Sequence, residues 1–281
     1  MRLTYRLLNV FAEPGDPFSG NPLCVFEDGR DLTDEQMQAL ARQFNLSETT
    51  FVVSPAEGAD AGVRIFTTSF EMPFAGHPTL GTAHVVRAMT SASDRLRLSM
   101  PAGVIPVQAE GDQWTLTANR GRVEADLPAD EVAAAVGLSP GDLVAPVQQV
   151  SVGTSQVVAQ AASVDLVRRA RVQPELLAAY AGMGQGGGET LVYVWAETGN
   201  GQIEARALIS DGASVSEDPA TGSACSNLGA WLAGAGRLGE WTVRQGRHVR
   251  RPSTLRLRVD PDGTVQVGGL VREVGSGEVV L

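Results

Sequence analysis

The sequence contains no lysine, because all 22 of its basic residues are arginines. This absence excludes a Schiff-base lysine, a pyridoxal-phosphate anchor and the lysine of a phosphate-binding P-loop. Only three histidines occur, and the sequence has neither a His-Glu-x-x-His motif nor a cluster of cysteines. A dedicated transition-metal site is therefore not expected, and the residues predict no cofactor.

Cysteines and long apolar runs are also scarce. Cys24 and Cys225 are the two cysteines, and both lie in apolar segments outside any Cys-x-x-Cys pair, which indicates reduced, buried thiols in a cytoplasmic protein. No apolar run reaches the roughly 18 residues of a membrane span, and the N-terminus lacks the pattern of a signal peptide. The net charge of −10, with scattered arginines, argues against nucleic acid or an anionic membrane as partner.

The sequence does contain a repeated motif, (His or Asp)-Pro-x-x-Gly-(Thr or Ser)-Ala. Its copies begin at His77 and Asp218, 141 positions apart. A polar residue before proline is typical of a helix start, where free backbone N–H groups favour an anion. Residues 219–236 include no charged side chain, and the only ionisable side chains of residues 73–86 are His77 and His84. The motif therefore predicts two buried helices, with His77 and Asp218 meeting over a shared anion site if the two halves face each other.

Other patterns predict a chain of strands and a few helices in two halves of similar plan. Residues 33–44 have the apolar spacing of an amphipathic helix, with Thr33 and Gln36 placed for a capping box and Asn45 as its end. Residues 121–129 look like a linker between the halves, and residues 271–281 form a last β-like piece that is expected to return to the first half.

These patterns predict two domains. The N-terminal domain comprises residues 1–120 plus about 268–281, and the C-terminal domain comprises residues 121–267. The segment 182–187 formally matches the dinucleotide motif GxGxxG. It follows a predicted helix and precedes a predicted strand, the reverse of the order that a dinucleotide site requires, so a loop is the better interpretation.

Glu48 is the clearest candidate for a general acid/base. It stands at the entrance to a run of β-branched and aromatic residues, 49–53, and burial beside apolar side chains raises the pKa of a carboxyl group towards the range of acid/base catalysis. Simpler interpretations exist for each candidate: an exposed strand edge for Glu48, a cap or core position for His77, an N-cap for Asp218, and helix packing for Ser223.

Several short segments, in the same order along the chain, resemble the signature segments of the phenazine-biosynthesis PhzF-like family. They extend from the first strand almost to the C-terminus and are Gly20-Asn21-Pro22, Asn45-Leu46-Ser47-Glu48-Thr49, Phe74-Ala75-Gly76-His77-Pro78-Thr79, Glu217-Asp218-Pro219-Ala220-Thr221-Gly222-Ser223-Ala224, Gln245-Gly246 and Arg251-Pro252-Ser253.

The resemblance implies an α+β fold of the diaminopimelate epimerase-like group, in which each of two pseudo-symmetric domains wraps a curved mixed β-sheet around a central buried helix. It also implies a cofactor-independent isomerase, active as a homodimer, that moves a proton on a small carboxylate-bearing metabolite. The family's catalytic glutamate, histidine, aspartate and serine fall on Glu48, His77, Asp218 and Ser223. The expected substrate-binding positions at the helix starts are Gly76, Thr221 and Gly222.

Two alternatives to this function stay open at the level of sequence. The same fold hosts two-thiol racemases and epimerases, which would require Cys24 and Cys225 to face one carbon atom from opposite sides. A non-catalytic protein that binds a small acid is the other. The chain also departs from the family pattern, with Asn9 where an aspartate is frequent and Ala207-Leu208 where an aromatic residue is frequent. These departures concern the substrate rather than the fold.

Overall fold

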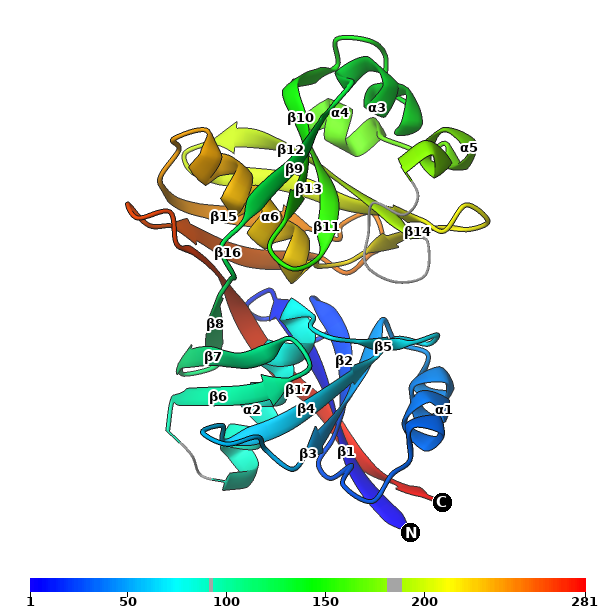
Figure 1. Cartoon of the computed structure of the whole chain (residues 1–281), viewed down its shortest axis with the longest axis vertical. Helices are drawn as coiled ribbons and strands as arrows, with labels where there is room; N and C mark the ends of the chain where they lie inside the picture. Colours follow the sequence, from blue (N-terminus) through cyan, green and yellow to red (C-terminus); the bar gives the residue numbers. More distant parts are fainter. Residues whose placement is uncertain (91–92, 181–188) are drawn as a thin grey trace. The chain divides into compact units, whose positions relative to one another are not determined.

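A computed structural model describes residues 1–90, 93–180 and 189–281. The chain divides into two compact units (Figure 1): unit 1 contains Met1–Thr117 and Gly268–Leu281, and unit 2 contains Ala118–Val267. The glycine-rich segment 182–187 lies outside the described residues. No helix among the described residues is long and apolar enough to cross a bilayer.

Unit 1 is built mainly from strands, which close into a barrel. Its elements are β1 (Arg2–Ala12), β2 (Asn21–Phe26), α1 (Asp34–Phe44), β3 (Glu48–Val53), β4 (Ala61–Phe66), β5 (Glu71–Met72), α2 (Gly76–Thr90), β6 (Arg95–Met100), β7 (Gly103–Glu110), β8 (Gln113–Thr117) and most of β17 (Val265–Val280). Each strand pairs with the next in the order β17-β1-β2-β3-β4-β6-β7-β8, and β8 pairs with β17 again.

Strand β17 closes this barrel from the far end of the sequence. It runs antiparallel to β1, with Arg2 opposite Val280 and Ala12 opposite Leu270. Figure 1 accordingly shows the N- and C-terminal strands side by side in unit 1. The prediction that the last residues return to the first half is confirmed.

Helix α2 occupies the interior of the barrel of unit 1, and α1 covers its outside. α2 contacts β1, β2, β3, β4, β6 and β8, and every residue from Gly76 to Ala83 is buried. Successive residues of β2 alternate between these two layers: Leu23 packs next to Gly81 of α2, whereas Cys24 and Phe26 join the apolar cluster under α1. Both faces of β2 are therefore covered.

Helix α1 follows the sequence prediction closely. Thr33 is its N-cap and forms the predicted capping box with Gln36, and Asn45 ends the helix in the left-handed conformation at φ 52°. The apolar face predicted from the spacing comprises Met37, Leu40, Ala41 and Phe44, of which the first three are buried and Phe44 is half-buried.

Unit 2 repeats this plan with different outer helices. Its elements are β9 (Arg122–Leu127), α3 (Ala129–Ala135), β10 (Leu143–Ser151), β11 (Ser155–Ala161), α4 (Val164–Arg169), α5 (Pro174–Leu177), the 3₁₀ turn η1 (Ala178–Tyr180), β12 (Thr190–Gly199), β13 (Gln202–Ser210), β14 (Val215–Asp218), α6 (Gly222–Gly234), β15 (Gly239–Gln245) and β16 (Ser253–Val259). The pairing runs β9-β10-β11-β12-β13-β15-β16, with parallel pairs at β11–β12 and β13–β15.

The parallel pairs β2–β3 and β4–β6 of unit 1 thus recur in unit 2 at the same places in the order of strands. Helix α6 corresponds to α2 and contacts β10, β11 and β16, while α3, α4 and α5 pack on another apolar cluster of the sheet. The predicted α+β fold, with a curved mixed sheet around a central buried helix in each half, is confirmed.

One local prediction is wrong. Residues 121–129 were expected to form a linker, but Arg122–Leu127 is strand β9, which pairs antiparallel with β10 from Val147 to Ser151. Most of its side chains are exposed, so its sequence carries little apolar alternation. The strand exists because β10 offers backbone hydrogen bonds, a long-range partner that local sequence does not reveal.

Candidate active site

Three elements of unit 1 bring polar side chains together at one end of its barrel. Asn21 begins β2, Glu48 begins β3, and His77 is the second residue of α2. β2 and β3 run parallel, with Leu23 opposite Glu48, so both strands start at this end. The Nε2 atom of His77 lies 3.4 Å from Oε2 of Glu48, and its Nδ1 atom lies 3.3 Å from Nδ2 of Asn21.

Burial keeps the His77 imidazole neutral. Its side chain is only 5% exposed, and this desolvation lowers its pKa from 6.5 to about 3. A hydrogen bond with the backbone carbonyl of Pro22 opposes the shift but is the weaker influence. At neutral pH, Glu48 therefore faces an uncharged ring that can orient a proton without holding the carboxyl group in a fixed ion pair.

The Glu48 side chain is 15% exposed, three times the exposed fraction of its histidine neighbour. A carboxyl group in such a place is largely shielded from bulk water. Glu48 is thus suited to take up and return a proton, because its backbone pairs with Leu23 of β2 and the next residue, Thr49, pairs with Phe66 of β4.

A second group of polar side chains lies in unit 2, around the end of β14 and the start of α6. The Thr221 hydroxyl donates to Oδ2 of Asp218 at 2.6 Å. Nε2 of Gln245 donates to the Asp218 carbonyl at 2.8 Å and to the Thr221 hydroxyl at 3.0 Å. Buried Tyr193 donates to Oε1 of Gln245 at 3.0 Å. The Gln245 amide that bonds Asp218 and Thr221 is therefore itself oriented by a hydrogen bond.

Gly246 allows the Gln245 segment to reach this corner. It adopts φ +79°, and a Cβ atom at this position would lie 2.4 Å from the Pro219 carbonyl oxygen and 2.2 Å from that of Arg251. Only glycine tolerates both the backbone conformation and this approach. Three of the motifs that carry the family resemblance therefore meet here: those of Asp218, Gln245 and Arg251.

Ser223, the second residue of α6, belongs to a separate network in unit 2. Its Oγ atom accepts a hydrogen bond from Nε2 of Gln156 on β11 at 3.0 Å. Oε1 of Gln156 in turn accepts from Nδ2 of Asn227, one turn further along α6, at 2.8 Å. Ser223 is half-buried, while Gln156 and Asn227 are buried.

The two repeat helices are buried as predicted, but they do not start where the motif suggested. α2 begins at Gly76, so His77 lies inside its first turn and Pro78 is its third residue, where the missing N–H costs no helical hydrogen bond. α6 begins only at Gly222, with Thr221 as its N-cap.

Asp218 is therefore not a helix cap, and the prediction that it starts a helix is wrong. It is the last residue of β14, where it pairs with Ala207 of β13. This pairing holds the backbone in an extended conformation through Asp218 and delays the helix by four positions. The same motif thus produces a helical histidine in one unit and an extended aspartate in the other.

The side chain of Glu217, the neighbour of Asp218, is buried rather than exposed to solvent. It forms an ion pair with Arg206 at 2.7 Å, and the two side chains are 9% and 7% exposed. Arg206 also donates to the carbonyl groups of Val167, Arg168 and Ala170. Through Arg206, the pair connects β14 to α4. Asp218 remains as the carboxylate beside Thr221.

The remaining histidine of α2, His84, packs beside Trp114. It accepts a hydrogen bond from the indole Nε1 of Trp114 at 3.3 Å. Asn9, where the family often has aspartate, donates from Nδ2 to the Pro17 carbonyl at 2.6 Å and so shapes the turn that leads to Asn21.

Sequence reasoning missed three residues that contact the predicted site residues. Asn21 and Gln245 stood within motifs that carried the family resemblance, and this was a usable signal. Gln156 lies in an ordinary strand pattern, Ser-Gln-Val-Val-Ala-Gln-Ala, and nothing local distinguishes it from Gln160. Only the pairing of β11 with its neighbours and its contact with α6 assign it a role.

Neither cysteine is placed for thiol chemistry. Cys24 and Cys225 are both fully buried, and desolvation raises the pKa of each thiol well above its usual range. Cys24 lies in the cluster under α1, on the face of β2 opposite α2. Because the thiolate is the reactive form, this burial disfavours the two-thiol racemase. Among the described residues, no three His, Cys, Asp or Glu side chains gather as a metal site would require.

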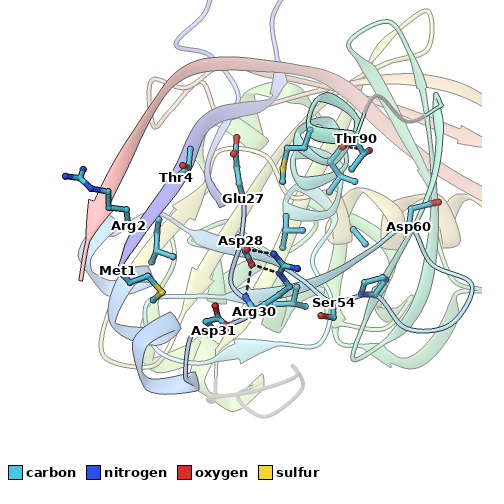
Figure 2. A pocket seen from close by; sticks show the side chains of 17 residues that line it. Met1, Arg2, Thr4, Glu27, Asp28, Arg30, Asp31, Ser54, Asp60 and Thr90 are labelled. Atoms are coloured by element: carbon cyan, nitrogen blue, oxygen red, sulfur yellow. Dashed lines mark hydrogen bonds and ion pairs between the residues drawn. The ribbon is translucent and has the colours of Figure 1, made fainter.

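A cavity of about 510 Å³ lies in unit 1, but at the other end of α2 (Figure 2). It is lined by the end of that helix, including Val86 and Thr90, and by the end of β3, whereas His77 and Glu48 are the starts of these elements. The Asp28 and Arg30 side chains at its rim bond each other at 2.6 Å. None of the predicted site residues lines this cavity.

Comparison with known proteins places these observations in a family context. Residues 8–274 match the family model described as phenazine biosynthesis-like protein, PhzC-PhzF. An uncharacterized isomerase of Pasteurella multocida is 36% identical, over 99% of this chain and 94% of that protein. The trans-2,3-dihydro-3-hydroxyanthranilate isomerase of Pseudomonas fluorescens is 32% identical, over 99% of both chains. A solved structure of a predicted epimerase from Pseudomonas aeruginosa covers 99% of both chains with a TM-score of 0.84 and 30% identity.

Proposed function

Because the chain belongs to the phenazine biosynthesis-like protein family and is an isomerase, we propose that it moves a proton on a small carboxylate-bearing metabolite by cofactor-independent acid/base catalysis. Glu48 is the acid/base in this proposal. The observation that carries it is the position of the Glu48 carboxyl group, partly shielded at a strand start and 3.4 Å from the neutral His77 ring.

The reaction needs one group that both removes and returns a proton. The Glu48 carboxylate takes a proton from an acidic carbon of the substrate, and the electron pair of the broken C–H bond moves into the adjacent conjugated system. The carboxylic acid, whose proton can exchange with solvent, then protonates a conjugated carbon, which restores the carboxylate. The substrate changes the position of its double bonds, and no atom is gained or lost.

In this proposal, the substrate is bound by Gly76, Gly222, Asp218, Ser223 and His77. The backbone N–H groups of Gly76 and Gly222 lie at helix starts, where the helix dipole favours a carboxylate. Asp218, oriented by the Thr221 hydroxyl, accepts from an amino group, and Ser223 bonds a polar oxygen of the substrate. His77 orients the substrate and the Glu48 carboxyl group as an uncharged ring.

The proposed substrate class is supported by the relative of Pseudomonas fluorescens, which is named for trans-2,3-dihydro-3-hydroxyanthranilate. That compound carries a carboxylate, an amino group and a diene, the three features that the proposed residues would use. We therefore place the substrate of this protein among cyclic or linear unsaturated amino or hydroxy acids of similar size.

Proton NMR in D₂O tests the proposal. The protein is mixed with trans-2,3-dihydro-3-hydroxyanthranilate and with a panel of small amino and hydroxy acids. We expect one compound to isomerise and gain deuterium with the wild type and not with Glu48→Gln. The control is Glu57→Gln, the same substitution at an exposed loop position, which should leave turnover unchanged.

Each outcome bears on a different part of the proposal. Full turnover by Glu48→Gln with a normal thermal melting curve would remove Glu48 as the acid/base. If no compound isomerises or exchanges with the wild type, the proposed substrate class is wrong.

A further inference from the structure

The Ser223 hydroxyl stands at the end of a chain of hydrogen bonds that has a defined direction. Asn227 donates to Gln156 at 2.8 Å, and Gln156 donates to Ser223 at 3.0 Å. Asn227 is fully buried and Gln156 is 5% exposed, so water has little access to this network. The direction of the chain decides whether Ser223 offers a hydrogen atom or a lone pair to a ligand.

Backbone groups determine the orientation of the Asn227 amide. The Val152 N–H group donates to Oδ1 of Asn227 at 2.9 Å, and the Thr154 carbonyl accepts from Nδ2 at 2.9 Å. A peptide N–H can only donate and a carbonyl can only accept. In a flipped amide, the NH₂ group would face the Val152 N–H and the amide oxygen would face the Thr154 carbonyl oxygen. Nδ2 therefore faces Thr154, and its second hydrogen atom is directed to Gln156.

The orientation of Gln156 follows from that of Asn227. Because Nδ2 of Asn227 is a donor, the Gln156 atom that meets it must be the carbonyl oxygen Oε1. The amide nitrogen Nε2 then faces Ser223, and the serine oxygen must accept. In the described part of the chain, the Ser223 side chain makes no other hydrogen bond, so its hydrogen atom has no protein acceptor.

We propose that Gln156 and Asn227 are positioning residues that keep the Ser223 hydroxyl hydrogen available for the ligand, so that Ser223 selects a hydrogen-bond acceptor on the ligand, such as a carboxylate, carbonyl or hydroxyl oxygen. This inference rests on the proposed function, in which Ser223 touches the substrate. It goes further because serine alone can donate or accept. A ligand that presents only an N–H group at this point would use the second lone pair of Oγ and leave the serine hydrogen atom without an acceptor.

Neutron diffraction of the ligand-free protein in D₂O tests the direction of the chain directly, whether or not the substrate class is right. We expect the deuterium atom on Ser223 Oγ to point away from Gln156, and two deuterium atoms on Nε2 of Gln156, one of them aimed at Oγ. Deuterium density on the serine oxygen directed at Gln156 would overturn the proposal.

Calorimetric titration with 3-hydroxyanthranilate tests the consequence for binding. This probe has the same substituents as the substrate of the Pseudomonas fluorescens relative on an aromatic ring that cannot isomerise. In Gln156→Glu, measured at pH 8.5, the introduced carboxylate can only accept, so the Ser223 hydroxyl turns towards it. We expect binding about tenfold weaker than in the wild type, the size of a hydrogen bond to a charged group.

The same substitution in a Ser223→Ala background separates the hydroxyl direction from the added charge. If Gln156 acts through Ser223, Gln156→Glu should change affinity less than about twofold in this background. Gln160→Glu, the same change on the same strand, is the matched control and should bind as the wild type does. An equal loss with and without Ser223 would overturn the positioning role, whereas a wild type that does not bind the probe would count against the proposed function.

Discussion

Among single residues, the buried groups of His77 and Arg206 differ in charge, because one is neutral and the other is paired. His77 has its charge removed, because burial lowers its pKa to about 3. Arg206 instead has its charge balanced by Glu217 at 2.7 Å and by three backbone carbonyl groups. The first arrangement leaves a neutral ring beside Glu48, and the second fastens the strand that carries Asp218.

The lowered pKa of His77 makes stability depend on pH. The unfolded protein binds a proton at this histidine below about pH 6.5, whereas the folded protein does so only near its folded pKa of about 3. The stability that the neutral His77 ring contributes to the folded protein is therefore fully present above pH 6.5 and is lost progressively as the pH falls towards 3. Between pH 7 and 5 the loss amounts to about 2 kcal/mol.

Urea unfolding at pH 7 and 5 measures this effect. In His77→Gln, the decrease in the free energy of unfolding between the two pH values should be smaller than in the wild type by about 2 kcal/mol. An NMR titration of the wild type should show no change in the His77 ring signals between pH 8 and 5. A ring that titrates near pH 6.5 would contradict the neutral imidazole.

The ion pair between Arg206 and Glu217 should be costly to break from one side. Arg206→Met leaves the Glu217 carboxylate buried without its cation, so we expect the free energy of unfolding to fall by about 3–5 kcal/mol. Adding Glu217→Gln removes the stranded charge and should recover part of this loss. Chemical denaturation of both variants provides the measurement, and a double variant no more stable than Arg206→Met would contradict the explanation.

At the scale of the element, α2 and α6 are central because small residues let strands approach them closely. A Cβ atom on Gly81 of α2 would lie 2.4 Å from Leu23, and one on Gly229 of α6 would lie 2.5 Å from Val265 and 2.9 Å from Leu257. Gly234, at the end of α6, has no neighbouring atom within 4 Å of such a position. The lack of charge predicted burial, while the glycines explain how closely the sheets wrap.

Gly229 and Gly234 lie in the same helix but differ in the space available for a methyl group, so they provide a matched pair of substitutions. Gly229→Ala should lower the free energy of unfolding by about 1–3 kcal/mol, because neighbouring side chains must shift to admit the methyl group. Gly234→Ala should be neutral or stabilising by up to about 1 kcal/mol, because alanine favours the helix and meets nothing. Thermal and urea unfolding compare the two variants, and an equal loss in both would show that packing at Gly229 is not the cause.

At the scale of the whole molecule, the two units repeat one plan, but the ends of the chain are joined only in unit 1. β17 begins in unit 2 at Val265 and continues into unit 1, where it pairs with β1 and β8. Residues from the end of the sequence thereby complete a barrel that starts with the first strand. Unit 1 is therefore built from both the first and the last residues of the sequence.

Removal of residues 268–281 should open the barrel of unit 1. Strand β1 loses its partner from Arg2 to Ala12, and β8 loses its neighbour, so the core around α2 becomes accessible to water. Hydrogen exchange measured by mass spectrometry should show lost protection in β1 and β8. Strands β12 and β13, which pair within unit 2, should keep theirs. Unchanged protection of β1 would contradict the role of β17.

Local sequence patterns were enough to identify the family, the α+β fold, the helix α1 with its capping box and the two uncharged central helices. Each of these depends on local chemistry: a motif of fixed residue types, an apolar spacing, or the absence of charge over a whole helix. The return of the last strand was also anticipated from its β-like pattern.

Only the tertiary structure decided that His77 is neutral, that Asp218 ends a strand rather than capping a helix, and that Glu217 pairs with Arg206. It also decided that residues 122–127 form a strand and that Gln156 holds Ser223. These properties arise from residues far apart in the chain. Burial, strand pairing and the direction of a hydrogen bond depend on the groups that folding brings alongside, and a local pattern does not contain that information.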